Sequence, residues 1–209
     1  MIFINSFPYT CRGFVALFAL CVFILSEAKA QTPQKAIKYS INIDARNVFT
    51  SGIQANTKIF LRKINADSVI SFNLLELSVD SVYINKNLTS FQKNDSTVLV
   101  KIPFQSIIGD SLTVDIFYKG IPKKDALWGG FYVSGTYAFN MGVGFQSKPH
   151  NFGRAWFPCF DNFTDRALYT VEVTTAPTFT AVCGGMLIDD TTYADGSIKW
   201  TWELNQPSA

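Results

Sequence analysis

Histidine is almost absent from this sequence, since His150 is the single one among 209 residues. A zinc site built from several histidines, or a His-Glu-x-x-His helix, needs at least two of them. His150 could in principle activate Cys159 as a nucleophile. However, Cys159 lies in the apolar run Trp156-Phe157-Pro158-Cys159-Phe160, where a thiolate would be poorly solvated. We therefore predict no catalytic residue, no metal ligand and no cofactor in this chain.

Cysteine is scarce as well. Of the four cysteines, Cys11 and Cys21 fall in the N-terminal apolar segment, which leaves Cys159 and Cys183 for the rest of the chain. Two cysteines do not make a disulfide framework. Both lie in apolar surroundings, where a free cysteine is an ordinary small core residue. The sequence favours two free thiols over a Cys159–Cys183 bridge.

Long hydrophobic runs are missing too. The longest run extends from Phe14 to Leu25, which is shorter than the about 20 residues that a membrane-spanning helix requires. Arg12 precedes it, and Ala28-Lys29-Ala30 places small residues as a signal-peptidase site does. We interpret residues 1–30 as a signal peptide and expect a secreted or periplasmic protein with no stable membrane span. An uncleaved N-terminal anchor is the alternative.

The chain also has little excess charge of either sign. The formal net charge is +2, and without a basic patch the chain has no electrostatic footprint for nucleic acid. Glycosidases need two converging carboxylates, but nothing indicates that Asp161, Asp165, Asp189 and Asp190 form such a pair. We expect Asp189 and Asp190 to lie in a solvated turn. No Gly-rich phosphate loop is present, and the pairs Gly129-Gly130 and Gly184-Gly185 are typical of turns or bulges.

What the sequence does contain is repeated alternation of apolar and polar residues. Ile37, Tyr39, Ile41 and Ile43 fall on one face of a predicted half-buried strand. Similar segments follow at 58–64, 69–75, 78–84, 97–102 and 112–118, with turn residues between them. No stretch keeps a helical period for three turns. We predict one all-β domain over residues 31–209, an antiparallel β-sandwich or a set of stacked sheets.

The end of the chain predicts a hairpin. Apolar residues at 186–188 and at 198–202 flank Asp195-Gly196, a dipeptide that is typical of tight hairpin turns.

Aromatic residues make up 15% of the chain. They could form a platform for carbohydrates, but large residues that fill the space between sheets are the more common explanation.

One stretch carries a family resemblance. The segment from His150 to Val173 contains Arg154, then Phe157-Pro158-Cys159-Phe160-Asp161, then Ala167 and a strand-like run. This pattern resembles the N-terminal domain of the aminopeptidase N family of zinc metallopeptidases, the gluzincin aminopeptidases. Tyr118-Lys119-Gly120 and Gly129-Gly130-Phe131-Tyr132 match in order and spacing, so the resemblance covers most of residues 36–209.

The resemblance implies a saddle-like β domain that packs against a thermolysin-like catalytic domain. That partner carries Gly-x-Met-Glu-Asn and His-Glu-x-x-His, and neither motif occurs here. We therefore expect an N-terminal domain, incomplete at its C-terminal end, that is inactive alone, with zinc held in the missing catalytic domain. The alternative is a free-standing secreted β-sandwich module that binds glycans or a protein partner.

The resemblance also implies one substrate-binding residue. In the family, an amide or carboxylate side chain before the arginine helps to hold the free amine of the peptide N-terminus. Gln146 is its nearest counterpart, while Lys148 or Pro149 replaces a second acidic or amide position. For Arg154 and Asp161 we favour structural roles, with the arginine forked onto carbonyls and the aspartate accepting backbone N–H groups.

Overall fold

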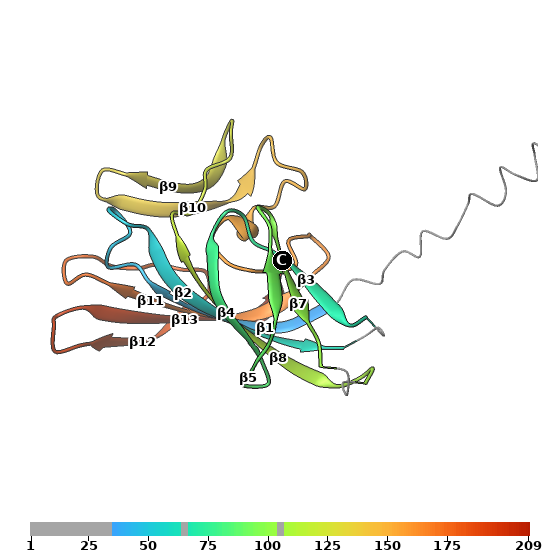
Figure 1. The fold of residues 1–209 in the computed structure, drawn as a ribbon. Coiled ribbons are helices and arrows are strands. Elements are labelled where there is room, and N and C mark those ends of the chain that lie inside the picture. The colour runs from blue at the N-terminus through green and yellow to red at the C-terminus, as the bar shows by residue number, and fades with distance from the viewer. Residues whose placement is uncertain (1–34, 64–66, 104–106) are drawn as a thin grey trace, which may run out of the picture. The chain divides into compact units, whose positions relative to one another are not determined.

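The computed structural model describes residues 35–63, 67–103 and 107–209. Strands dominate these residues, and Gly153–Ala155 forms a short 3-10 helix, η1 (Figure 1). In the described part of the chain no helix is long and apolar enough to cross a membrane. The predicted signal peptide lies outside the described residues. The prediction of an all-β fold with antiparallel sheets is confirmed.

The strands form three sheets. The largest has the order β12-β13-β11-β1-β2-β8-β4-β5. Its strands are β1 (Lys35–Asp44), β2 (Ile53–Arg62), β4 (Ser78–Ile84), β5 (Asn87–Leu88), β8 (Ser111–Gly120), β11 (Ala167–Thr175), β12 (Met186–Thr192) and β13 (Ile198–Ser208). The second sheet contains β3 (Val69–Asn73), β7 (Thr97–Lys101) and β6 (Phe91–Lys93) in that order, and the third contains β10 (Tyr137–Gly144) and β9 (Gly129–Ser134).

Two strand details differ from the sequence prediction. β1 pairs with β11 in parallel, whereas the other pairs in the described sheets are antiparallel. In addition, Ile37 is 49% exposed although it was predicted on the buried face. The register between β1 and β2 shifts between Ala36 and Lys38, so Ala36 points into the core in its place. A bulge of this kind reverses the alternation on one side of it.

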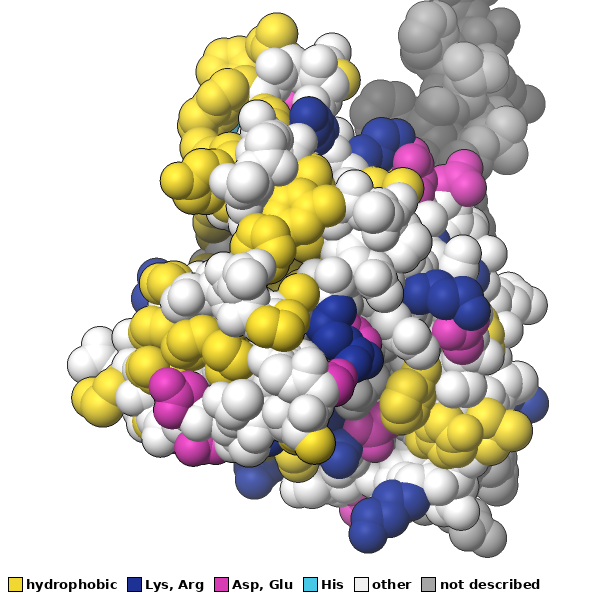
Figure 2. Space-filling model, turned by 90° about the vertical axis from the view of Figure 1, so that its left-hand side faces the viewer, with side chains coloured by type: hydrophobic (Ala, Val, Ile, Leu, Met, Phe, Trp, Pro, Cys, Tyr) yellow, Lys and Arg dark blue, Asp and Glu magenta, His cyan; other side chains and the backbone are white. Residues whose placement is uncertain are grey.

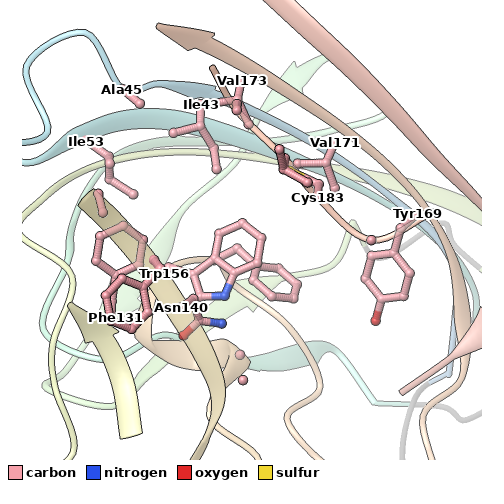
Figure 3. A pocket seen from close by; sticks show the side chains of 18 of the residues that line it. Ile43, Ala45, Ile53, Phe131, Asn140, Trp156, Tyr169, Val171, Val173 and Cys183 are labelled. Carbon is pink, nitrogen blue, oxygen red and sulfur yellow. The ribbon is translucent and has the colours of Figure 1, made fainter. Parts of the chain in front are cut away.

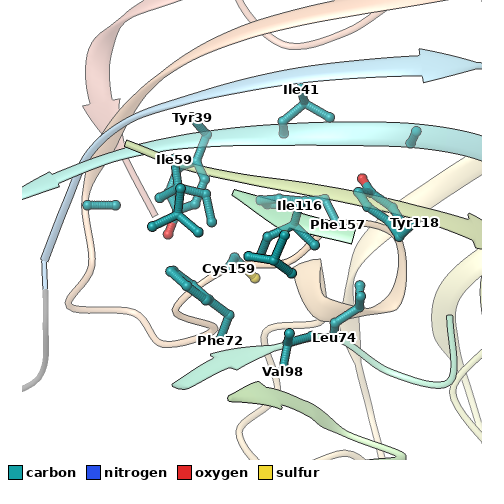
Figure 4. Packing of buried hydrophobic residues seen from close by; sticks show 14 of the residues in the cluster. Tyr39, Ile41, Ile59, Phe72, Leu74, Val98, Ile116, Tyr118, Phe157 and Cys159 are labelled. Atoms are coloured by element: carbon teal, nitrogen blue, oxygen red, sulfur yellow. The ribbon is translucent and has the colours of Figure 1, made fainter. Parts of the chain in front are cut away.

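The core lies between the large sheet and the β3-β7-β6 sheet. Residues from both sheets are fully buried there, among them Ile59 and Ile116 from the large sheet and Phe72 and Val98 from the small one (Figure 4). Most aromatic residues of the core pack in pairs; the Phe72 and Phe160 rings, for example, stack with centroids 5.0 Å apart. The interpretation of aromatic residues as filling between sheets holds for this region.

The segment from Gly153 to Asp165 ties the sheets together. Cys159 pairs with Asn73 through both backbone groups, with N···O distances of 2.8 and 3.1 Å. The Tyr39 hydroxyl, in β1, donates to Asp165 Oδ2 at 2.9 Å and accepts from the Phe160 N–H at 3.1 Å. This segment therefore connects an end of β3 to the central strand of the large sheet.

Both cysteines of the described region are free thiols, as the sequence favoured. Burial raises the pKa of the Cys159 thiol well above its ordinary value, and nearby Asp161 raises it further. The single histidine does not approach it as a base: the His150 ring Nδ1 lies 3.1 Å from the carbonyl of Gly144. Cys159 is a packing residue.

A buried ion pair holds the same segment. Arg154 contacts Asp161 through Nη1, and both side chains are nearly inaccessible to solvent. The arginine also donates to the carbonyls of Asn151 and Pro149, at 2.8 and 3.3 Å, and Asp161 accepts the Gly153 N–H at 3.2 Å. The structural roles predicted for both residues are confirmed.

The C-terminal hairpin is present but its turn is longer than predicted. β12 ends at Thr192 and β13 begins at Ile198, so Asp195 and Gly196 lie within a longer loop. Asp195 accepts the Ser197 N–H and hydroxyl, at 3.0 and 2.6 Å. The prediction that Asp189 and Asp190 form a turn is wrong, because both lie in β12, an exposed edge strand. Pairing with β13 overrides the turn preference of aspartate.

Replacing Arg154 with alanine should destabilise the fold strongly. Asp161 would remain buried without its cation, which typically costs about 3–5 kcal/mol of unfolding free energy. Arg46→Ala, which removes an exposed ion pair with Asp44, is the matched control and should change stability little. Urea unfolding followed by circular dichroism measures both. Equal midpoints for the two variants would contradict a central role for the buried pair.

Candidate functional site

The candidate site is the loop of residues 145–150, which follows the β9–β10 hairpin. Gly129 and Gly130 begin this hairpin with positive φ angles of 111° and 78°. A Cβ at Gly129 would lie 2.0 Å from the carbonyl oxygen of Val143, and one at Gly130 would lie 2.6 Å from that of Lys123. Only glycine fits this close backbone approach. The turn or bulge predicted for the pair is confirmed.

Asp125 organises the start of the loop. Its Oδ1 accepts the N–H groups of Leu127, Trp128 and Gln146, at 3.0, 3.2 and 3.1 Å. Its Oδ2 accepts the N–H and the hydroxyl of Ser147, at 2.9 and 2.6 Å. These bonds, with the Ser147 hydroxyl first, lower the pKa of Asp125 well below the ordinary range. The carboxylate therefore stays ionised and links the loop to the turn before β9.

Arg154 holds the other end of the loop, because its guanidinium donates to the carbonyls of Pro149 and Asn151. The loop thus runs between an anionic anchor and a cationic one. Between them Gln146 and Lys148 are exposed, and only the backbone N–H of Gln146 is taken by Asp125. The Gln146 side chain lies at the surface, whereas Arg154 and Asp161 are buried, and Arg154 supports the loop through Pro149 and Asn151.

Next to this loop, β10 carries a stripe of exposed apolar side chains. The members alternate along the strand and continue into the loop: Tyr137, Phe139, Met141, Val143 and Phe145. Tyr132 stacks on Phe139 with centroids 5.3 Å apart. Figure 2 shows hydrophobic side chains gathered on the upper part of the face that includes this hairpin. Exposed apolar patches of this kind mark interaction surfaces.

A cavity of about 670 Å³ lies between the hairpin and the large sheet. Figure 3 shows Ile43, Val171 and Val173 of the sheet facing Phe131, Asn140 and Trp156. Cys183 reaches the cavity from the loop before β12. The wall of the cavity is largely apolar.

The described residues contain no group of three His, Cys, Asp or Glu side chains that could hold a metal ion. The donor set that a zinc site requires is therefore not met in this part of the chain.

One family model matches this chain. The Peptidase M1 N-terminal domain matches residues 33–208, which is most of the chain. The chain belongs to this family. The M1 N-terminal domain was therefore correctly identified from the segment between Arg154 and Asp161. No curated protein matches the chain significantly.

Solved structures share the fold. An M1 zinc metallopeptidase from Deinococcus radiodurans aligns with a TM-score of 0.75 and 19% identity, over 84% of this chain and 40% of its own. Legionella pneumophila aminopeptidase A in complex with aspartic acid gives 0.67 and 14%, over 84% and 20%. Native yeast LTA4 hydrolase gives 0.61 and 17%, over 83% and 27%. This chain thus spans less than half the length of each of these proteins.

Sequence reasoning missed Asp125. Apolar alternation does not report it, because its role lies in backbone contacts that come from two separate segments. A local signal did exist: an aspartate a few residues before a glycine pair is typical of a turn in which the carboxylate accepts backbone N–H groups.

Replacing Asp125 with asparagine should loosen the loop. The amide NH₂ would face N–H groups of Ser147 or Gln146, so their exchange with solvent should become about tenfold faster or more. In the unsubstituted chain the protection should be complete above the ordinary carboxylate pKa of about 3.9 and be lost only as the pH falls through the lowered pKa. Amide exchange by NMR measures this, with Asp80→Asn as the exposed control. Unchanged exchange in Asp125→Asn would refute the anchor.

Proposed function

We propose that this chain is the N-terminal, non-catalytic domain of a secreted zinc metallo-aminopeptidase, an enzyme that removes N-terminal residues from peptides. The observation that carries the proposal is the family match over residues 33–208. The likeness to larger M1 zinc metallopeptidases supports it. A Deinococcus radiodurans relative of similar fold is described as bound to a Tyr-Ser-Ala substrate. A free-standing binding module is not favoured by these matches.

The partner in this proposal is the catalytic domain of the same enzyme, and the zinc belongs to that domain. The exposed apolar stripe of β10 supports a docking role, since apolar side chains that alternate along an exposed strand are stabilised when a partner buries them. The stripe leads directly into the loop that carries Gln146. A partner that covers the stripe would therefore lie beside this side chain.

Within that assembly Gln146 would contribute one hydrogen bond to the free amine of the substrate. A neutral amide oxygen can accept from an ammonium group, and such a charge-assisted bond is stronger than a neutral one. The two anchors, Asp125 and Arg154, fix the loop before substrate arrives, so little order has to be gained on binding. Lys148, beside Gln146, cannot share this task because it carries the same charge as the amine.

The chain alone should release no product from alanine p-nitroanilide, with or without added zinc, because its described residues contain no set of donors for a catalytic metal. The DNA that follows the codon for Ala209 should encode His-Glu-x-x-His in a continuing or frame-shifted reading frame. Zinc-dependent turnover by the purified 209-residue chain would overturn the proposal. A stop codon followed by unrelated sequence would instead favour a domain that acts without its own catalytic partner.

In an enzyme that contains both domains, Gln146→Ala should lower kcat/KM about tenfold or more, mainly through KM. The reason is the loss of one charge-assisted hydrogen bond to the substrate amine. The matched control is Gln92→Ala, an exposed glutamine in β6, which should leave both constants unchanged. A Gln146→Ala enzyme with the kinetics of the control would remove Gln146 from the substrate site and leave the domain assignment intact.

A further inference from the structure

The cavity beneath the β9–β10 hairpin has an unusual set of unsatisfied polar atoms. Among the described residues, the buried side-chain atoms without a hydrogen-bond partner are Asn140 Oδ1, Asn151 Oδ1 and Trp156 Nε1. All three residues line this one cavity. Buried polar atoms are nearly always paired, so three unpaired ones around a single space require a common explanation.

These atoms come from different parts of the fold. Asn140 lies in β10, Asn151 follows the loop of residues 145–150, and Trp156 follows η1. Figure 3 shows the Asn140 amide beside the indole of Trp156, with the apolar side chains of the sheet opposite. Together the three residues offer one N–H donor and two carbonyl acceptors to the cavity.

The remaining wall is apolar and rich in aromatic rings. Phe49 and Phe179 lie against each other with centroids 5.1 Å apart, and the Trp156 and Phe157 rings are separated by 4.5 Å. The volume of about 670 Å³ falls within the usual 300–1,000 Å³ of small-molecule sites. An apolar wall with a few converging polar atoms is the usual construction of such sites.

The charge of the wall limits what can bind. Among the described residues that line the cavity there is no lysine, arginine or histidine, so an anion would find no counter-charge in them. The two aspartates of the wall are already engaged: Asp161 pairs with Arg154, and Asp165 accepts from the Tyr39 hydroxyl and the Ala36 N–H. A cation would therefore have to compete with existing bonds. A neutral molecule meets neither obstacle.

We propose that this cavity binds a small neutral aromatic molecule that carries one hydroxyl group. The hydroxyl accepts from Trp156 Nε1 and donates to the side-chain carbonyl of Asn140 or Asn151. The ring system packs between Phe131 and the valines of β11. This site is separate from Gln146, whose side chain lies at the surface, and it does not depend on the aminopeptidase assignment.

The test uses the 209-residue chain and three probes of equal ring size. These are 2-naphthol, 2-methylnaphthalene, in which a methyl group replaces the hydroxyl, and 2-naphthoate, which is anionic. Binding is followed by the indole N–H resonances of the tryptophans in ¹H–¹⁵N spectra, with that of Trp156 identified by its loss in Trp156→Phe. We expect 2-naphthol to shift this resonance saturably and to bind at least about tenfold more tightly than either analogue.

Two pairs of variants control the result. Trp156→Phe removes the donor and keeps a ring, so it should weaken 2-naphthol binding about tenfold. The probe's own fluorescence measures this affinity. Trp128→Phe, at an exposed tryptophan, should leave the affinity unchanged. Cys183→Trp adds volume at the cavity wall and should abolish binding, whereas Cys183→Ser should retain it.

Equal affinity for 2-naphthol and 2-methylnaphthalene would overturn the proposal, as would a Trp156 resonance that does not move. In either case water or a segment of a partner protein, rather than the hydroxyl of a phenol-like molecule, pairs with Trp156 Nε1. If Cys183→Trp fails to fold, the comparison of Trp156→Phe with Trp128→Phe still decides the outcome.

Discussion

The buried ion pair between Arg154 and Asp161 is the interaction on which the arrangement of this domain depends. Two charges withdrawn from water are tolerated only when they are paired and their remaining donors and acceptors are used. Here the arginine also binds the carbonyls of Pro149 and Asn151, and the aspartate binds the Gly153 N–H. The pair therefore fixes a segment that has almost no regular structure of its own, and it does so at the junction of the sheets.

The loop of residues 145–150 is ordered by its contacts with that junction. Arg154 holds one end of the loop from inside, and Asp125 holds the other with three hydrogen bonds to Gln146 and Ser147. Two further bonds tie Asp125 to the turn before β9. Both anchors act mainly on backbone groups, so the side chains between them remain available. In the proposed function this division matters, because the charged residues position the loop while the Gln146 side chain stays exposed.

The β9–β10 hairpin carries two different features. Its stripe is exposed and apolar, which suits contact with a protein, and the cavity that Tyr137, Phe139 and Asn140 line has unsatisfied polar atoms, which suits a small molecule. Neither feature is stabilising for an isolated chain, because exposed apolar area and unpaired buried polar atoms both cost free energy. The main core avoids both costs, with Phe72, Ile59 and Val98 fully buried.

Short stretches of consecutive residues were enough to predict an all-β fold, the family and the structural roles of Arg154 and Asp161, because alternation and a local motif lie within such stretches. Ile37 shows the limit: a bulge reversed its face, and the bulge depends on pairing with β2. The parallel pairing of β1 with β11 and the hydrogen bonds that make Asp125 an anchor arise only in the folded chain. Each joins segments far apart in the chain, and the geometry between such segments leaves no periodic trace in either one.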